Sequence, residues 1–108
     1  GGNPININPI SSQVPQTFAL HQNYPNPFNP ITKIRFDIPS NVGNGRERSV
    51  KVIIYDLLGR EVTTLVNEQL RPGSYSVDWD GTGFASGVYF YSLVTNDFVE
   101  TKRMVLIK

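Results

Sequence analysis

Few residues in this chain have the chemistry that catalysis needs. Nucleophilic catalysis requires a nucleophile, a base and a group that orients the base, but the sequence has no cysteine and a single histidine, His21. Acid–base catalysis on glycosides requires two carboxylates about 5–10 Å apart across a cleft. The chain has nine acidic residues, but one small domain offers little room for a cleft. We therefore expect no catalytic residue and no enzyme.

Asp78 and Asp80, in the segment DWDGTG, are the best candidates for binding a cation. Both would lie on one face of a strand, and the pair Asp80-Gly81 resembles half of a calcium loop. A calcium ion takes about six to eight oxygen ligands, however, and the segment lacks the glutamate that closes an EF-hand loop. A strand that ends in an Asx turn explains the segment better. We assign no metal ligand and no cofactor-binding residue, and a cation at this loop is the alternative.

Aromatic side chains could stack on sugars. Most aromatic residues of a small domain belong to its core, but Tyr89 and Tyr91 alternate with Phe90, so one of the two faces must point outward unless something covers it. The candidates are Tyr55, Trp79, Tyr89, Phe90 and Tyr91. A surface carbohydrate-binding or adhesion module of a larger secreted protein is therefore an alternative function, as is a spacer domain.

Length, composition and charge limit the remaining classes. The chain has 108 residues, enough for one domain with a single core. Its 9 glycines and 8 prolines indicate many turns. The net charge of +1 gives no strong field for nucleic acid or anionic lipid, so we expect neither as a partner. No apolar run approaches the roughly 20 residues of a membrane-spanning helix, so we expect no membrane insertion.

The sequence is organised as short segments in which apolar and polar residues alternate. In KIRFDI, residues 33–38, and SYSVDW, residues 74–79, one face is apolar, as in half-buried strands. Further strand-like segments are VKVIIY, EVTTLV, VYFYSLVT and FVETKRMVLIK, and another lies near residues 18–20. No segment keeps a helical period. We predict an all-β fold, an antiparallel immunoglobulin-like β-sandwich of about seven strands, with a small closed barrel as the alternative.

Turn signals separate these segments. DLLGR, residues 56–60, places Gly59 where a hairpin needs a positive φ. RPG, residues 71–73, has the composition of a β-turn, and Asn96-Asp97 joins the last two strand-like segments as a short hairpin. Such turns agree with an antiparallel arrangement.

Two segments depart from simple alternation. EVTTLV interrupts its pattern between Val62 and Leu65, which indicates a β-bulge. VKVIIY carries Ile53 and Tyr55 opposite its other apolar residues, so both faces of this strand are candidates for burial. Between the first two long segments, residues 39–49 form a polar loop.

The domain boundary is expected near residue 18. Residues 1–17 have the polar composition of a flexible linker, in which residues 1–2 are compatible with a cloning remnant, and residues 18–108 form the folded domain. NYPNPFNP, near its start, holds three prolines in eight residues, which excludes a helix or a central strand. We expect this stiff segment to hold Tyr24 and Phe28 against the core, and its asparagines to form Asx-type turns.

Three strings, in this order and spacing, carry a family resemblance. They are LHQNYPNPFNPITKIRFDIP, VKVIIYDLLGREVTTLVNEQLRPGSYSVDWDG and ASGVYFYSLVTNDFVETKRMVLIK. From about residue 18 to its end, the chain resembles the C-terminal sorting domains of type IX secretion substrates (the type A family). These domains are similar to the Ig-like module of flagellar hook-capping proteins. YPNPFNP, YDLLGREV and GVYFY are the most specific motifs.

The resemblance places the family's motifs on particular residues. The motifs of the first part of the domain fall on Pro25, Asn26, Pro27, Tyr55, Asp56, Gly59 and Arg60. The motifs of its second part fall on Gly73, Tyr75, Trp79, Asp80, Gly81, Ser86, Gly87, Val88 and Tyr89. The closing strand falls on Lys102, Met104, Val105, Leu106, Ile107 and Lys108.

The resemblance also implies a role, a non-catalytic secretion and sorting signal without a cofactor. Such a domain ends a larger exported protein, so a cargo domain is covalently attached on its N-terminal side. The outer-membrane secretion machinery takes the protein from the periplasm to the cell surface or the extracellular space, where a sortase-like peptidase removes the signal. We expect the cut within residues 1–17, near SSQVPQ. The open edges of a sandwich leave dimerisation as an alternative state.

The last strand is the expected recognition element. A terminal strand at a sheet edge presents unpaired backbone groups and side chains to a partner. TKRMVLIK has basic residues around an apolar run, which suits a groove with an acidic rim, although lysines on an edge strand also prevent unwanted pairing. Together with the SGVY motif, the expected recognition residues are Gly87, Tyr89, Lys102, Arg103, Met104, Val105 and Lys108.

Overall fold

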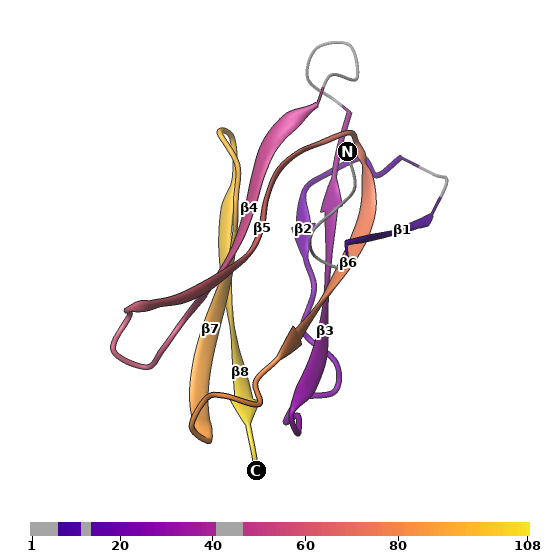
Figure 1. The fold of residues 1–108 in the computed structure, drawn as a ribbon. Helices are drawn as coiled ribbons and strands as arrows, with labels where there is room; N and C mark the ends of the chain where they lie inside the picture. Colours follow the sequence, from indigo (N-terminus) through magenta and orange to yellow (C-terminus); the bar gives the residue numbers. More distant parts are fainter. Residues whose placement is uncertain (1–6, 12–13, 41–46) are drawn as a thin grey trace.

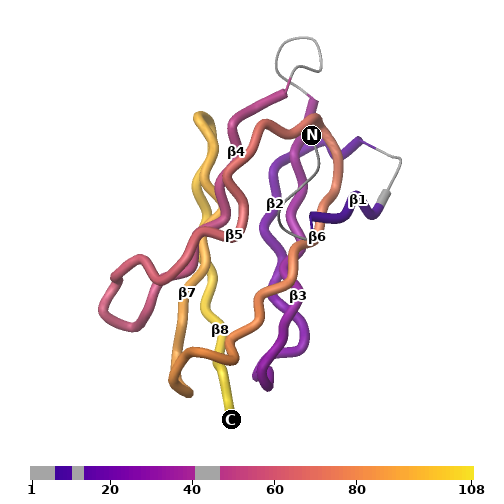
Figure 2. Tube along the Cα trace, in the orientation of Figure 1, coloured from indigo at the N-terminus to yellow at the C-terminus, as the bar shows by residue number. Residues whose placement is uncertain are grey.

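The fold consists of two antiparallel β-sheets packed face to face (Figure 1). A computed structural model describes residues 7–11, 14–40 and 47–108, and these residues contain eight strands and no helix. Figure 2 shows the two sheets as separate layers, so the sandwich prediction is confirmed over the closed barrel. Residues 1–2, interpreted as a cloning remnant, and most of the polar loop 39–49 lie outside the described residues.

Sheet A contains β1 (Asn8–Ser11), β2 (Ala19–Leu20), β3 (Ile31–Ile38) and β6 (Gly73–Asp80), in the order β1-β6-β3-β2. β3 and β6 pair along their whole length, and β1 adds to the free edge of β6. The strand count is therefore eight rather than about seven. β1 gave no strand signal because its four residues include a proline and a single apolar side chain, a composition that only an edge strand tolerates.

Sheet B contains β4 (Arg48–Tyr55), β5 (Glu61–Leu70), β7 (Gly87–Val94) and β8 (Val99–Leu106), in the order β5-β4-β7-β8. Two hairpins, β4–β5 and β7–β8, make up this sheet, and the pairing of β4 with β7 joins them. The last strand of the chain is thus an edge strand.

The strand order is that of an immunoglobulin-like sandwich. In that fold strands A, B and E share one sheet and strands C, F and G share the other, with C′ added beside C in variable-type domains. β2, β3 and β6 take the positions of A, B and E, and β5, β4, β7 and β8 those of C′, C, F and G. Tyr89, near the start of β7, donates a hydrogen bond to the carbonyl oxygen of Ala85, four residues upstream, at 2.7 Å, which is the tyrosine corner of such sandwiches.

The alternation of the sequence decides which side chains fill the space between the sheets. Successive residues of a strand point to opposite faces, and the apolar sets of the predicted strands all point inward. The buried residues of the long strands include Ile34, Phe36, Ile38, Val50, Val52, Ile54, Val77, Trp79, Tyr91, Leu93, Met104 and Leu106. Trp79 lies at the centre of an aromatic cluster, with ring-centre distances of 5.7 Å to Phe28, 5.4 Å to Phe84 and 5.3 Å to Tyr89.

β5 contains the irregularity that its sequence predicts. Its pairing with β4 skips Leu65 and then Val62, so each is an extra residue opposite a regular strand. Leu65 is buried and Val62 packs against the core. β-bulges bend a strand and increase its twist, and the β4–β5 hairpin projects away from sheet A (Figure 1).

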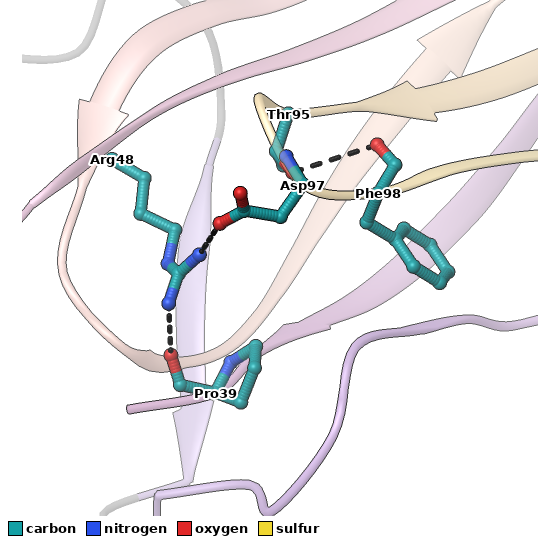
Figure 3. A network of polar contacts seen from close by, with 5 residues as sticks. All are labelled: Pro39, Arg48, Thr95, Asp97 and Phe98. Carbon is teal, nitrogen blue, oxygen red and sulfur yellow. Dashed lines mark hydrogen bonds and ion pairs between the residues drawn. The ribbon is translucent and has the colours of Figure 1, made fainter. Parts of the chain in front are cut away.

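Arg48 holds several segments together at the end of the sandwich opposite the C-terminus (Figure 3). Its guanidinium donates to Asp97 Oδ2 at 2.7 Å, in the β7–β8 turn, and to the carbonyl oxygen of Pro39 at 3.4 Å. It also lies 5.0 Å from the ring centre of Phe18, a favourable cation–π distance, and Phe18 stacks on Phe98 at 4.8 Å. The predicted start of the domain is thereby fixed to sheet B.

The two aromatic residues of the proline-rich segment behave differently. Phe28 is 1% exposed, as predicted, whereas Tyr24 is 80% exposed, so the expectation of a core position is wrong for Tyr24. Tyr24 forms an isolated bridge with Lys33, whose side chain lies on the outward face of β3. Pairing opposite an outward residue directs the tyrosine ring to solvent.

We expect Phe28→Ala to lower the free energy of unfolding by about 3–5 kcal/mol, because it removes a fully buried ring and leaves a cavity beside Trp79. Chemical denaturation of the 108-residue chain measures this change. Leu58→Ala, at a position that is 76% exposed, is the control and should change stability by no more than about 0.5 kcal/mol. Equal effects of the two substitutions would contradict the packing described here.

Candidate functional site

The side chains of β8 point alternately into the core and out of it. Met104 and Leu106 are buried between the sheets, whereas Arg103 is exposed and Val105 is half-buried on the opposite side. Of the expected recognition residues, Met104 is therefore fully buried while the domain is folded, and Tyr89 keeps only 7% of its surface exposed.

Residues 22–28, which we call the strap, run along the free edge of β8. The backbone N–H of Phe28 donates to the carbonyl oxygen of Val105, and the N–H of Ile107 donates to the carbonyl oxygen of Phe28, both at 2.9 Å. These two bonds form a short parallel bridge between the beginning and the end of the domain.

Two side chains of the strap complete the cover of this edge. Asn26 Oδ1 accepts a hydrogen bond from the backbone N–H of Val105 at 3.0 Å, and Gln22 Nε2 donates to the carbonyl oxygen of Arg103 at 2.7 Å. The expectation that the edge presents unpaired backbone groups is therefore wrong for these groups of residues 103–107. An added strand could not pair there without displacing the strap.

Asn23 and Tyr91 fasten the strap to the core. Tyr91 Oη donates to the carbonyl oxygen of His21 at 2.7 Å and accepts from the backbone N–H of Asn23 at 2.8 Å. The Asn23 amide donates to Thr32 Oγ1 at 2.9 Å and to the carbonyl oxygen of Pro25 at 3.2 Å. Burial of the Tyr91 ring raises its pKa to about 12. The tyrosine thus joins the strap as a neutral hydroxyl.

Two asparagines of the proline-rich segment bond other parts of the domain. Asx-type turns were expected for them, but the Asn23 side chain bonds Thr32, nine residues later at the start of β3, and the Asn26 side chain bonds Val105 of β8, 79 residues later. The peptide bonds before Pro25, Pro27 and Pro30 are cis. The asparagine side chains therefore combine contacts near the motif with one long-range bond to the last strand.

Asp56 organises the tip of the β4–β5 hairpin. Its Oδ1 accepts hydrogen bonds from the backbone N–H groups of Leu58 and Arg60, both at 2.9 Å, and its Oδ2 accepts one from Arg60 Nε at 2.8 Å. The bonds from Arg60, first from its backbone, hold the pKa of Asp56 below its ordinary value. Gly59 has the predicted positive φ, +82°. The turn leaves the Leu57 and Leu58 side chains 66% and 76% exposed.

An open hollow of about 220 Å³ lies between this hairpin tip and the start of β7. Its lining residues are Asp56, Leu57, Leu58, Arg60, Ser86, Gly87, Val88 and Tyr89. The backbone φ of Gly87 is +151°, a value that other residues rarely adopt, so the backbone itself requires glycine here. Two family motifs, YDLLGR and SGVY, therefore meet at one surface hollow.

The face of sheet B that points away from sheet A is apolar at its centre. Tyr55 lies opposite Phe90, and Val88 lies opposite Val105, in the registers of β4–β7 and β7–β8. Ile53 precedes Tyr55 by two residues on the same face, and all five side chains are half-buried. We call these five residues the outer patch. Its signal in the sequence is an apolar set on both faces of β4 and β7.

The basic residues of the last strand do not form one cluster. Arg103 projects beside the outer patch, opposite Phe90. Lys102 lies on the inward side, where its Nζ is 3.5 Å from Glu100 Oε2. Lys108 Nζ donates to the carbonyl oxygen of Thr82 at 2.6 Å at the end of the sandwich. Of the expected cationic residues, only Arg103 therefore borders the outer patch.

The DWDGTG segment forms the turn that its sequence predicts. Asp80 Oδ1 accepts hydrogen bonds from the backbone N–H and the hydroxyl of Thr82, and these bonds lower the pKa of Asp80. Asp78 pairs instead with Lys33 at 2.9 Å. A Cβ on Gly81 would come within 2.9 Å of Leu106 Cδ2 and 3.3 Å of the Pro30 carbonyl oxygen, so a larger residue there would force the buried Leu106 side chain to shift. Within the described parts of the chain, no three His, Cys, Asp or Glu residues are grouped as metal ligands would be.

The comparisons with known proteins agree with this geometry. Residues 22–108 match the family described as the secretion system C-terminal sorting domain. Because the match covers most of the chain, this protein belongs to that family, the C-terminal sorting domains of type IX secretion. A comparison with curated proteins gave no match. In the described ranges no helix is long and apolar enough to cross a membrane.

We expect Tyr91→Phe to lower the free energy of unfolding by about 1–3 kcal/mol at neutral pH, because it leaves the buried N–H of Asn23 and the carbonyl oxygen of His21 without this partner. The advantage of the wild type is complete below the ordinary tyrosine pKa of 10.0 and is lost as the pH rises towards about 12. Denaturation of both proteins at pH 7, 10 and 12 measures this difference. Tyr24→Phe removes a hydroxyl at an exposed position and should have no effect. A pH-independent difference for Tyr91→Phe would contradict the assignment.

We expect Asn26→Ala to expose the backbone N–H of Val105, because that group loses the acceptor that it has among the described residues. Hydrogen exchange of the Val105 amide should become about fivefold faster or more, as for a bond that contributes about 1 kcal/mol. Asn29→Ala is the control. Asn29 directly follows the strap and also precedes a proline, but its side chain bonds no described residue. Equal exchange rates of the Val105 amide in both variants would contradict the hydrogen bond between Val105 and Asn26.

Proposed function

We propose that this domain directs a cargo attached to its N-terminal side through the type IX outer-membrane machinery to the cell surface, where a sortase-like peptidase removes it. The observation that carries the proposal is the family match over residues 22–108. The structure supports it indirectly. The hydrogen bonds between the strap and β8 join the two ends of the domain, so the domain can fold independently of an attached cargo.

The cargo side of the domain offers a site for the cut. β1 pairs with β6, and β2 pairs with β3, so the chain between these strands joins two fixed points. Of the segment SSQVPQ, residues 12 and 13 lie outside the described residues, whereas Val14 and Gln16 are exposed. We propose that the peptidase cuts between β1 and β2, which leaves β1 on the cargo.

The alternative function, carbohydrate binding or adhesion, has less support. Of the five aromatic residues considered for it, Trp79, Tyr89 and Tyr91 are buried. Tyr55 and Phe90 are half-buried on the outer patch. Two adjacent rings on a flat sheet provide less surface for a sugar than the stripe that the sequence allowed.

Fusion of residues 1–108 to the C-terminus of a periplasmic reporter tests the proposal. In a host with the type IX machinery we expect the reporter at the cell surface, as measured by antibody labelling of intact cells. The reporter without the domain, and the fusion in a host without the outer-membrane machine, should both remain in the periplasm. Sequencing the new termini should place the cut within residues 12–17. Retention of the fusion in the competent host would refute the proposed function.

A further inference from the structure

The outward faces of the two sheets differ in chemistry. On sheet A this face is largely polar, with Lys33 and Asp78 as an ion pair at 2.9 Å and Arg35 exposed beside them. A sheet face in contact with water normally has this character. On sheet B the same kind of face carries the outer patch. Contiguous apolar surface on a small domain marks an interaction site, and sheet A shows that this fold does not require it.

The hairpin tip extends the outer patch. Leu57 and Leu58 are the most exposed leucines of the described chain, and the hydrogen bonds of Asp56 fix the turn that presents them. The hollow beside the tip includes Val88, a member of the outer patch. The hairpin projects away from sheet A (Figures 1 and 2). The apolar surface therefore continues from the outward face of sheet B into the hollow beside the hairpin tip.

The strap limits how a partner can recognise β8. Phe28, Asn26 and Gln22 occupy the backbone groups of residues 103–107 that point away from β7. A partner therefore cannot add a strand to this part of the edge, the usual mode of recognition for a terminal strand. What remains accessible is the row of outward side chains, in particular Arg103 and Val105.

The charges at the border of the outer patch are unbalanced. Arg103, on β8, lies opposite Phe90 of β7, and Lys51, on β4, lies opposite Val94 of β7. No residue in the described ranges forms an ion pair with either of them. Glu61, on the edge strand β5, lies opposite Tyr55 of β4 and is therefore on the far side of the sheet from β8. A partner that covers the patch is electrostatically complementary to it if the partner's carboxylates face Arg103 on β8.

We infer that the outer patch and Arg103 form the surface with which the domain docks on a protein of the export machinery, one whose facing surface is apolar with carboxylates opposite β8. The inference rests on the proposed function and names the surface that would carry it. Recognition then depends on side chains of β4, β7 and β8 together rather than on the last strand alone. An interface of this kind has an apolar centre and a polar, charged rim.

The reporter fusion tests this inference with matched substitutions on the two outward faces. Phe90→Thr and Arg103→Glu change the outer patch and its border, whereas Ile31→Thr and Arg35→Glu make similar changes on sheet A. Ile31 is 50% exposed, and Arg35 forms no ion pair with a described residue. At equal expression, each change on sheet B should lower surface reporter by about tenfold, as for an interface residue whose loss costs about 1.4 kcal/mol. The changes on sheet A should stay within about twofold, as for near-neutral surface positions.

Further variants separate the explanations. Arg103→Lys keeps the charge and should export within about threefold of wild type. Thermal unfolding of each 108-residue variant verifies folding, and Val88→Thr replaces Phe90→Thr if the latter unfolds. Normal export of the patch variants would overturn this inference and leave the proposed function intact, whereas failure of the wild-type fusion would overturn both. Sedimentation that shows a dimer lost in the patch variants, with export unchanged, would assign the patch to a second copy and overturn the inference.

Discussion

The hydrogen bonds between the strap and β8 hold the first and last parts of the domain together, and the remaining structure depends on them. Asn26 and Val105 are 79 positions apart in the sequence, so this contact closes nearly the whole chain into one unit. Together with the neighbouring bonds of the strap, it also covers the part of this edge strand at residues 103–107 that would otherwise be open to pairing. Because Phe28 brings its ring into the core beside Trp79, the same residue connects the cover of the edge to the packing of the sandwich.

The family motifs are explained largely by these structural demands. Asn26 bonds β8, Asp56 builds the hairpin tip, and Gly81 gives Leu106 room. Tyr89 combines a core position with the bond to Ala85 that fixes the corner before β7. A chain that keeps these motifs therefore keeps a shape. The outer patch is not explained in this way, because the side chains of its motif positions Tyr55, Val88 and Val105 point away from the core.

Much of the fold could be predicted from the sequence, because strand alternation and turn chemistry are local. Residues 33–38 and 74–79 showed which side chains enter the core, and the interruption between Val62 and Leu65 showed a bulge. The strap could not be predicted in this way, since a bond from an asparagine side chain to a strand 79 positions later leaves no periodic signal. β1 could not be predicted either, because its four residues show no apolar alternation. It is a strand only through its pairing with the free edge of β6. The outer patch was visible only as a strand with two apolar faces, and only the fold shows that one of them is uncovered.

Under the proposed cleavage, the position of β1 would give the domain two different surfaces before and after the cut. While the cargo is attached, β1 fills the place beside β6 that another immunoglobulin-like domain would give to strand D. Once the chain is severed between β1 and β2, the departing cargo takes that filler with it, and the row of amide and carbonyl groups on β6 becomes vacant. The discarded domain would then be adhesive towards extended peptides in a way that the intact protein is not. The proposed cut would therefore also expose a new pairing edge on the domain that remains.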